Sequence, residues 1–144
     1  MTEIQVHLRF LTPCLGHVRQ QDCDRFERDT HGNVIFMNSW WRRVLDYGAQ
    51  ALGKHQRDIA DVRVHPRIEG ETKQFKRYYA PHRYKLHEAF LANASIGVRM
   101  LLPDSIPLDD FIVLLRLAGS YRGISPYGWK TGYGHFEVIN CERL

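Results

Sequence analysis

The sequence lacks the long apolar segment of a membrane-spanning helix, which takes about 18 consecutive apolar residues. Its opening stretch, MTEIQVHLRF, also lacks the basic region and the apolar core of a signal peptide. Cysteine is scarce, and three thiols, Cys14, Cys23 and Cys141, are too few and too odd in number for a disulfide framework. We therefore expect a cytoplasmic protein with free cysteines and no membrane partner.

Familiar catalytic motifs are also missing. The chain has no Walker loop, no H-E-x-x-H and no G-x-S-x-G, and the GYGHF segment at 132–136 does not follow a strand and open a helix as dinucleotide binding requires. Repeats and low-complexity tracts are absent. A chain of 144 residues, 44% hydrophobic and 25% charged, has the composition of an ordinary globular domain, so we predict one domain over residues 1–144.

The positive charge is concentrated in one part of the chain. The formal net charge is only +4, but residues 54–85 hold nine Lys and Arg against four Asp and Glu, and the rest of the chain is close to neutral. A concentrated positive segment attracts phosphate groups, whereas evenly spread charge mainly keeps a protein soluble. The charge pattern therefore points to a local binding surface.

Hydrophobic alternation predicts four strands. Residues 3–11 alternate cleanly, residues 58–70 place Val62, Val64 and Ile68 on one side, a third strand lies within 87–102, and 135–141 supply the fourth. Pro66 predicts that this end of the second strand lies at a sheet edge or at a bulge. Residues 17–37 form a polar excursion that we predict to be a loop or a small hairpin.

Two helices are predicted between these strands. The first spans 40–52, with Asn38 or Ser39 as N-cap and Gly53 after its end. The second lies within 104–119, with Pro107 in its first turn and Gly119 at the C′ position that ends it. The order β-α-β-β-α-β predicts an α+β, ferredoxin-like fold with a four-stranded antiparallel sheet and two helices on one face.

Residues 121–138 combine glycines with aromatic rings. Backbone N–H groups of a glycine-rich loop can approach phosphate oxygens, and Tyr121, Tyr127, Trp129 and Tyr133 can stack unpaired bases beside Arg122 and Lys130. The alternative is that the glycines make tight turns and the rings cover the sheet edge.

A basic excursion, residues 73–85, has the same character. Its sequence, KQFKRYYAPHRYK, interleaves cations with aromatic rings, which is typical of a nucleic-acid-facing hairpin. A plain solvated hairpin is the alternative.

Two segments, RDTHGNVIFMNSWWRRVL at 28–45 and LLRLAGSYRGISPYGWKTGYGHFEV at 114–138, resemble the RAMP superfamily of CRISPR-associated proteins, most closely its crRNA-binding backbone subunits. Arg28, Asp29 and Gly32 match the family's R-D-x-x-G stretch, whereas Met37, Asn38 and Ser39 match its Gly-Ser-Ser helix start only loosely. The resemblance implies a ferredoxin-like fold, a glycine-rich loop before the last strand, and a thumb-like projection at 73–85 that bears on RNA.

The same resemblance implies candidate catalytic residues. Asp24, with Asp22 as a rival, stands where target-cleaving members carry an acidic residue that supports metal-dependent RNA cleavage, and His17 lies in a loop that other members use for histidine-dependent processing. Mg²⁺ would be needed for the first chemistry. Isolated solvated side chains are the alternative reading. A zinc site is a further, weaker candidate, with the ligand inventory Cys14, His17, Cys23 and His31.

We therefore expect a CRISPR-associated, antiviral RNA-binding protein that requires no cofactor. Its partners would be guide or single-stranded RNA, other complex subunits, and further copies of the chain along RNA. Two alternatives stay open: a metal- or histidine-dependent endoribonuclease, and a protein-interaction domain that mimics or occupies a subunit position. The predicted RNA-binding residues are Arg28, Lys73, Lys76, Arg77, Tyr78, Arg83, Arg122, Gly128, Trp129, Lys130, Gly132, Tyr133 and Gly134.

Overall fold

Four strands form the main sheet of the computed structural model, which describes residues 1–127 and 131–144. They are β1 (Thr2–Phe10), β7 (Arg63–Val64), β10 (Ser95–Leu102) and β11 (Phe136–Arg143), in the order β11-β1-β10-β7 with antiparallel neighbours. On β1 the predicted alternation holds: Ile4, Val6, Leu8 and Phe10 are fully buried, whereas Arg9 is exposed. The predicted α+β class and the four-stranded antiparallel sheet are confirmed.

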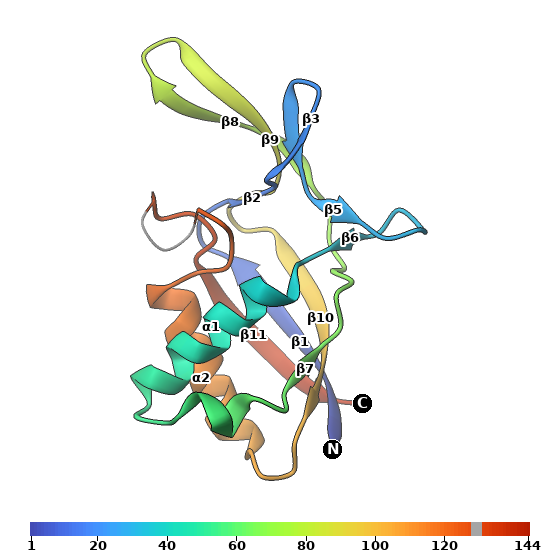
Figure 1. The fold of residues 1–144 in the computed structure, drawn as a ribbon, viewed down its shortest axis with the longest axis vertical. Helices are drawn as coiled ribbons and strands as arrows, with labels where there is room; N and C mark the ends of the chain where they lie inside the picture. Colours follow the sequence, from blue (N-terminus) through green and yellow to red (C-terminus); the bar gives the residue numbers. More distant parts are fainter. Residues whose placement is uncertain (128–130) are drawn as a thin grey trace.

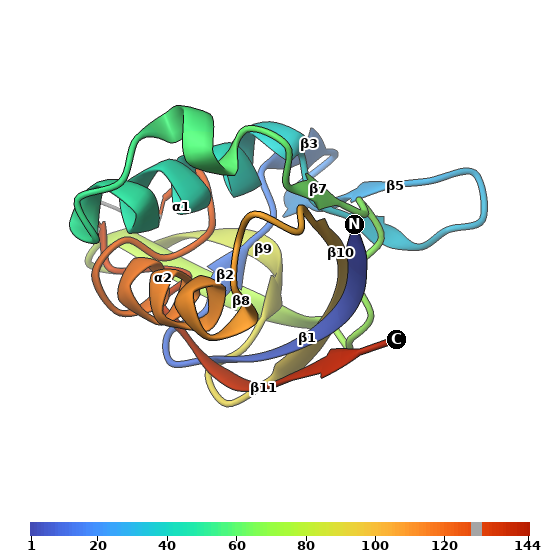
Figure 2. The ribbon, with the colours of Figure 1, turned by 90° about the horizontal axis from the view of Figure 1, so that it is seen from below.

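Two long helices, α1 (Asn38–Ala51) and α2 (Leu108–Tyr121), lie together on one face of this sheet (Figure 2). Their close approach depends on Gly48, where a Cβ would lie 2.6 Å from the backbone oxygen of Leu114. A short 3-10 helix, η1 (Gln56–Ile59), follows α1. In the described part of the chain, no helix combines the length and the apolar character that crossing a membrane would require.

The predicted helix ends are partly wrong. Met37 is the N-cap of α1 and makes no side-chain cap hydrogen bond, so the predicted capping by Asn38 or Ser39 does not occur. Gly119 lies inside α2 and is buried against Phe136, and the left-handed glycine comes later, at Gly123 with φ of 78°. A glycine required for close packing gives the same sequence signal as a helix stop. Gly53, with φ of 71°, does follow α1 as predicted.

A second sheet projects beyond the first. It contains β2 (Cys14–Leu15), β3 (Val18–Gln20), β4 (Cys23–Arg25), β8 (Lys73–Ala80) and β9 (Arg83–Phe90). Strands β8 and β9 form a long antiparallel hairpin, and β4 pairs with β9 in parallel. Figure 1 shows the β8–β9 and β3–β4 hairpins extending in the same direction, away from the helices.

The polar excursion at 17–37 contains two small hairpins rather than one. The first is β3–β4, and the second pairs β5 (Glu27–Arg28) with β6 (Val34–Ile35). The predicted second strand is short: only Arg63 and Val64 pair regularly with β10, and isolated bridges follow at Arg67 and Glu69. As Pro66 indicated, β7 lies at the edge of the main sheet.

Aromatic side chains join the two sheets into one core. The ring of Phe10 on β1 stacks at 5.8 Å on Phe90 of β9, and Phe90 lies 5.1 Å from Phe26. Phe36 contacts Trp40 at the start of α1, with ring centroids 5.1 Å apart. Because these rings are buried, the base of the projecting sheet is held on the same core as the helices.

Candidate nucleic-acid interface

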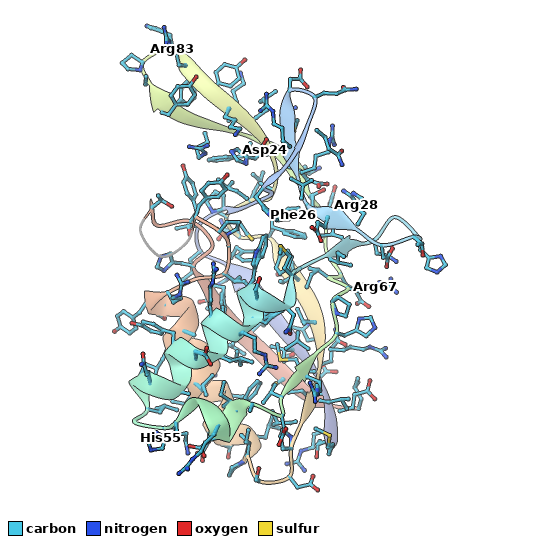
Figure 3. All side chains as sticks on the ribbon, viewed as in Figure 1. Asp24, Phe26, Arg28, His55, Arg67 and Arg83 are labelled. Atoms are coloured by element: carbon cyan, nitrogen blue, oxygen red, sulfur yellow. The ribbon has the colours of Figure 1, made fainter. Side chains whose placement is uncertain are left out.

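The hairpin made by β8 and β9, here called the projecting hairpin, carries an exposed row of rings and cations on one face. Tyr78 and Tyr84 are cross-strand partners, 61% and 44% exposed, with ring centroids 5.5 Å apart. The ammonium of Lys76 lies 4.8 Å from the centre of the Tyr84 ring. Arg83 stands at the end of the hairpin (Figure 3). Accessible π-faces beside cations suit an unpaired nucleic-acid strand.

The opposite face of the projecting hairpin meets the glycine-rich segment, residues 121–138. The guanidinium of Arg77 lies 5.1 Å from the centre of the Tyr127 ring. The ring of Phe75 meets Tyr133 edge-on at 6.0 Å. The structure thus brings together two segments that are about fifty residues apart in the sequence and that both carry predicted RNA-binding residues.

The described glycines of this segment have different roles. Gly123 and Gly134 adopt φ of 78°, and the backbone of Gly134 donates a hydrogen bond to Pro13 and accepts one from Ile124. A Cβ at either position would collide with backbone atoms, so tight turns explain both. Gly132, with φ of 79°, faces open space and leaves its backbone accessible. Gly128, Trp129 and Lys130 lie outside the described residues.

An open groove of about 700 Å³ separates the projecting hairpin from the β3–β4 hairpin. It is lined by two exposed tyrosines, two cations, one acid and one aliphatic side chain: Tyr79, Tyr84, Arg19, Lys85, Asp22 and Leu86. This groove extends the aromatic and basic character of the hairpin toward the β3–β4 hairpin. The groove is open to solvent, unlike the enclosed pockets that hold small molecules.

Asp24, the candidate catalytic carboxylate, lies on β4 near the base of both hairpins (Figure 3). It is buried and pairs with Lys85 at 3.0 Å and with Arg19 at 3.4 Å. Burial alone would raise its pKa, but the hydrogen bond and charge of Lys85, with smaller contributions from His87 and Arg19, hold the pKa below the usual 3.8. Asp24 is therefore a charged link between two hairpins.

His17, the second catalytic candidate, packs its ring against Trp40 with centroids 5.1 Å apart. Its Nδ1 atom is buried and has no hydrogen-bond partner among the described residues. Asp22, the rival to Asp24, is exposed and lines the groove.

The R-D-x-x-G stretch builds the β5–β6 hairpin. Arg28 donates to the backbone oxygen of Gly32 at 2.9 Å and forms an ion pair with the buried carboxylate of Glu88. The carboxylate of Asp29 accepts hydrogen bonds from His31 and Asn33 across the turn, and chiefly the Asn33 backbone bond lowers its pKa. The guanidinium of Arg28 remains partly accessible, 41% exposed, beside these internal contacts.

The other predicted cations are distributed around the hairpins. Lys73 is exposed at the start of β8 and pairs with Glu71 at 2.9 Å. Arg122 is half-buried at the end of α2, where burial and the charge of Arg43 lower its pKa. Arg122 therefore lies on the helical side of the molecule, and the structure does not bring it to the exposed face of the projecting hairpin.

The four candidate zinc ligands have separate environments. Cys14 is buried, and its thiol lies 3.1 Å from the backbone oxygen of Ile124, with a pKa that burial raises well above the usual 9.0. Cys23 is buried on β4, whereas His31 is exposed in the β5–β6 turn. Within residues 1–127 and 131–144, no group of three or more His, Cys, Asp or Glu side chains has the geometry to hold a metal ion.

Sequence reasoning missed three residues of this region. Arg19 and Leu86 line the groove, and His87 is fully buried behind Arg77. Arg19 gives no signal in the sequence, because a lone arginine in a polar stretch is ordinary. His87 follows Lys85 by two positions, so the alternation of β9 could have placed both on one face.

No family model and no curated protein matches the sequence. Among solved structures, the fold is similar to one chain of the cryo-EM structure of the type III-B Cmr-beta bound to cognate target RNA, with a TM-score of 0.67 and 11% sequence identity. The match covers 99% of this chain and 60% of that chain. At this low identity the likeness shows a shared fold, and this protein spans about three fifths of the length of the chain it matches.

Proposed function

We propose that this protein is a RAMP-like RNA-binding domain with a ferredoxin-like fold that acts as a component of a CRISPR complex. The sheet order β11-β1-β10-β7 corresponds to strands four, one, three and two of the β-α-β-β-α-β pattern, which supports the fold assignment. The similar chain comes from a complex bound to target RNA, which supports RNA and neighbouring subunits as partners.

The contact between the projecting hairpin and the glycine-rich segment carries the proposal. Arg77 contacts Tyr127 and Phe75 contacts Tyr133, so the two segments predicted to bind RNA lie side by side, which supports the proposal. Cations and aromatic rings lie on both faces of the projecting hairpin, so an RNA strand could contact positively charged side chains along the whole hairpin.

Stacking and charge contribute differently to this binding. Base stacking is worth ~1–3 kcal/mol per base, so Tyr78 and Tyr84 supply affinity that changes little with salt. Lys76 and Arg83 supply phosphate attraction, which weakens as salt rises. Single-stranded or guide RNA fits this combination, since its bases are free to stack.

RNA cleavage stays a prediction, with Asp24 and His17 as the candidate catalytic residues. The carboxylate of Asp24 is buried and occupied by two cations, so it is not free to orient a ribose hydroxyl in this conformation. We therefore leave catalysis outside the proposal.

The test is the affinity of a fluorescent oligouridine, measured by anisotropy over a range of salt. In the Lys76→Ala/Arg83→Ala variant, the slope of log affinity against log salt should be shallower by about 1.4, since each phosphate contact on single strands contributes ~0.7. Arg63→Ala/Arg116→Ala removes the same charge from β7 and α2 and is the matched control.

Tyr84→Ala should weaken binding by the ~1–3 kcal/mol of one stacked base, whereas Tyr84→Phe keeps the ring and should bind like the wild type. If Lys76→Ala/Arg83→Ala and the control Arg63→Ala/Arg116→Ala lost the same affinity for oligouridine, the attraction would be nonspecific and the proposal would be refuted. Binding of a CRISPR-complex subunit that survives nuclease treatment, in a protein that ignores oligouridine, would favour the protein-interaction alternative.

A further inference from the structure

A fully buried histidine stands behind the hairpin arginine that meets the glycine-rich segment. His87 lies on β9, and its Nδ1 atom is 2.7 Å from the backbone oxygen of Gly16. Its Nε2 atom is 3.0 Å from Nε of Arg77. The same ring meets Tyr127 edge-on at 5.6 Å.

These contacts fix the protonation state of the ring. A guanidinium can only donate hydrogen bonds, so Nε2 of His87 must be the unprotonated acceptor. A backbone oxygen can only accept, so Nδ1 of His87 must carry the proton and donate it to Gly16. His87 is therefore neutral, and it orients Arg77 through one nitrogen while the other anchors the ring.

Charged residues on three strands interact with this ring. Arg77 faces it from β8, Lys85 from β9 and Asp24 from β4, and the phenol ring of Tyr127 covers it from the glycine-rich segment. Burial lowers the pKa of His87 below the usual 6.5, and the charges of Arg77 and Lys85 add to that lowering. The Gly16 hydrogen bond and Asp24 oppose it without reversing the direction.

We propose that His87 is a positioning residue for RNA binding: its neutral ring holds the Arg77 guanidinium against Tyr127 for contact with an RNA phosphate, and protonation of His87 releases Arg77 and weakens binding. This inference rests on the proposed function, because it assigns a role to the face of the projecting hairpin that meets the glycine-rich segment. His87 itself is buried and does not touch RNA.

The direction of the pH effect follows from burial. A protonated His87 would place a second donor against the Arg77 guanidinium, so the orienting hydrogen bond would be lost. The new charge would lie inside the protein, and the Asp24 carboxylate would offset part of it. We therefore expect the loss of orientation to decide the sign of the effect.

Two substitutions of His87 distinguish the role of its Nε2 atom from the role of its Nδ1 atom. Glutamine at this position places its amide near the Nε2 position and can still accept from Arg77, and it does not titrate. Asparagine places its amide near the Nδ1 position, so it can keep the Gly16 contact but offers no acceptor to Arg77. His87→Asn should therefore reproduce the binding defect of Arg77→Ala, and His87→Gln should not.

The experiment measures oligouridine affinity for the wild type, His87→Gln, His87→Asn, Arg77→Ala and the His87→Asn/Arg77→Ala double variant, with thermal melting to confirm folding. At about pH 8, His87→Asn and Arg77→Ala should each bind roughly tenfold more weakly, and the double variant no more weakly than Arg77→Ala alone. If His87 had only a structural role, the loss of affinity caused by His87→Asn would add to the loss caused by Arg77→Ala in the double variant.

The pH profile is the second readout. Between about pH 8 and about pH 5, wild-type affinity should fall relative to His87→Gln, since the two proteins differ only at residue 87. If the pH profiles of the wild type and His87→Gln ran parallel, or if the affinity losses added in the double variant, the inference would be overturned. The proposed function would still stand if Arg77→Ala weakened binding. No oligouridine binding by the wild type would overturn both.

Discussion

Replacing Glu88 should destabilise the fold strongly, because its carboxylate joins three parts of the chain. Glu88 is 7% exposed, and its two oxygens accept from the backbone N–H of Phe26 at 3.0 Å and the hydroxyl of Thr72 at 2.9 Å. It also forms the ion pair with Arg28. Glu88→Gln keeps the shape of the side chain but turns one acceptor into a donor that faces other donors.

The magnitude follows from these contacts. Loss of one charge-assisted hydrogen bond costs ~1.5–3 kcal/mol, and the partial exposure of Arg28 places the expected cost of Glu88→Gln near 2 kcal/mol. Glu88→Ala also leaves the buried Phe26 N–H without its acceptor, which adds ~1–3 kcal/mol. At ~2–4 °C per kcal/mol for a chain of this size, the melting temperature should fall by about 6 °C for Glu88→Gln.

Urea unfolding followed by tryptophan fluorescence, together with thermal melting, measures both variants. Glu71→Gln is the control, because the pair of Glu71 with Lys73 is solvent-exposed and should contribute little to stability. In a double-mutant cycle, Glu88→Gln should cost less in an Arg28→Gln background than in the wild type. The reasoning fails if Glu88→Gln costs no more than Glu71→Gln, or if the Glu88 and Arg28 losses simply add.

Two further predictions concern packing and acid. Gly119→Ala should lower the free energy of unfolding by about 1–3 kcal/mol, because a Cβ would lie 2.6 Å from Phe136 Cδ2 and this clash outweighs the better helix propensity of alanine. Urea unfolding measures the change, with Ser120→Ala as the control, and a gain in stability would contradict the prediction. Because the pKa of His87 is lower in the folded protein, His87 takes up a proton in the unfolded chain at a higher pH than in the folded one, so the free energy of unfolding should start to fall as pH drops below 6.5. The lowered pKa of Asp24 has the same effect below 3.8. Urea titrations across pH measure both steps, and a first step that persists in His87→Gln would exclude His87 as its source.

The main sheet could be predicted because its strands carry a local signal. In β1 the apolar side chains alternate over nine residues, and in β10 the same period runs from Ile96 to Leu102. Strands β2 and β4 contain only two and three residues and carry no readable period. Their pairing depends on what the rest of the chain brings beside them, so the sequence showed the second sheet only as a basic hairpin and a polar excursion at 17–37.

The candidate site shows the same limit. Alternating cations and rings marked residues 73–85 from local composition alone, and the structure makes them a hairpin. The partner of Arg28 is sixty residues away, so no local pattern could distinguish an arginine that pairs with buried Glu88 from one that is free for RNA. The contact of Arg77 with Tyr127 was likewise beyond sequence reasoning, since fifty residues separate them.

Two buried acids anchor the base of the projecting hairpin to its neighbours. Asp24 attaches the Lys85 side of β9 to the β3–β4 hairpin, and Glu88, three residues further along the strand, ties β9 to the β5–β6 hairpin. Beyond these links, Tyr78 is solvent-exposed and Arg83 stands at the far end of the hairpin (Figure 3). Substitutions near the base should therefore change stability first, whereas substitutions near the tip should change RNA affinity alone, so the two properties can be measured separately in one protein.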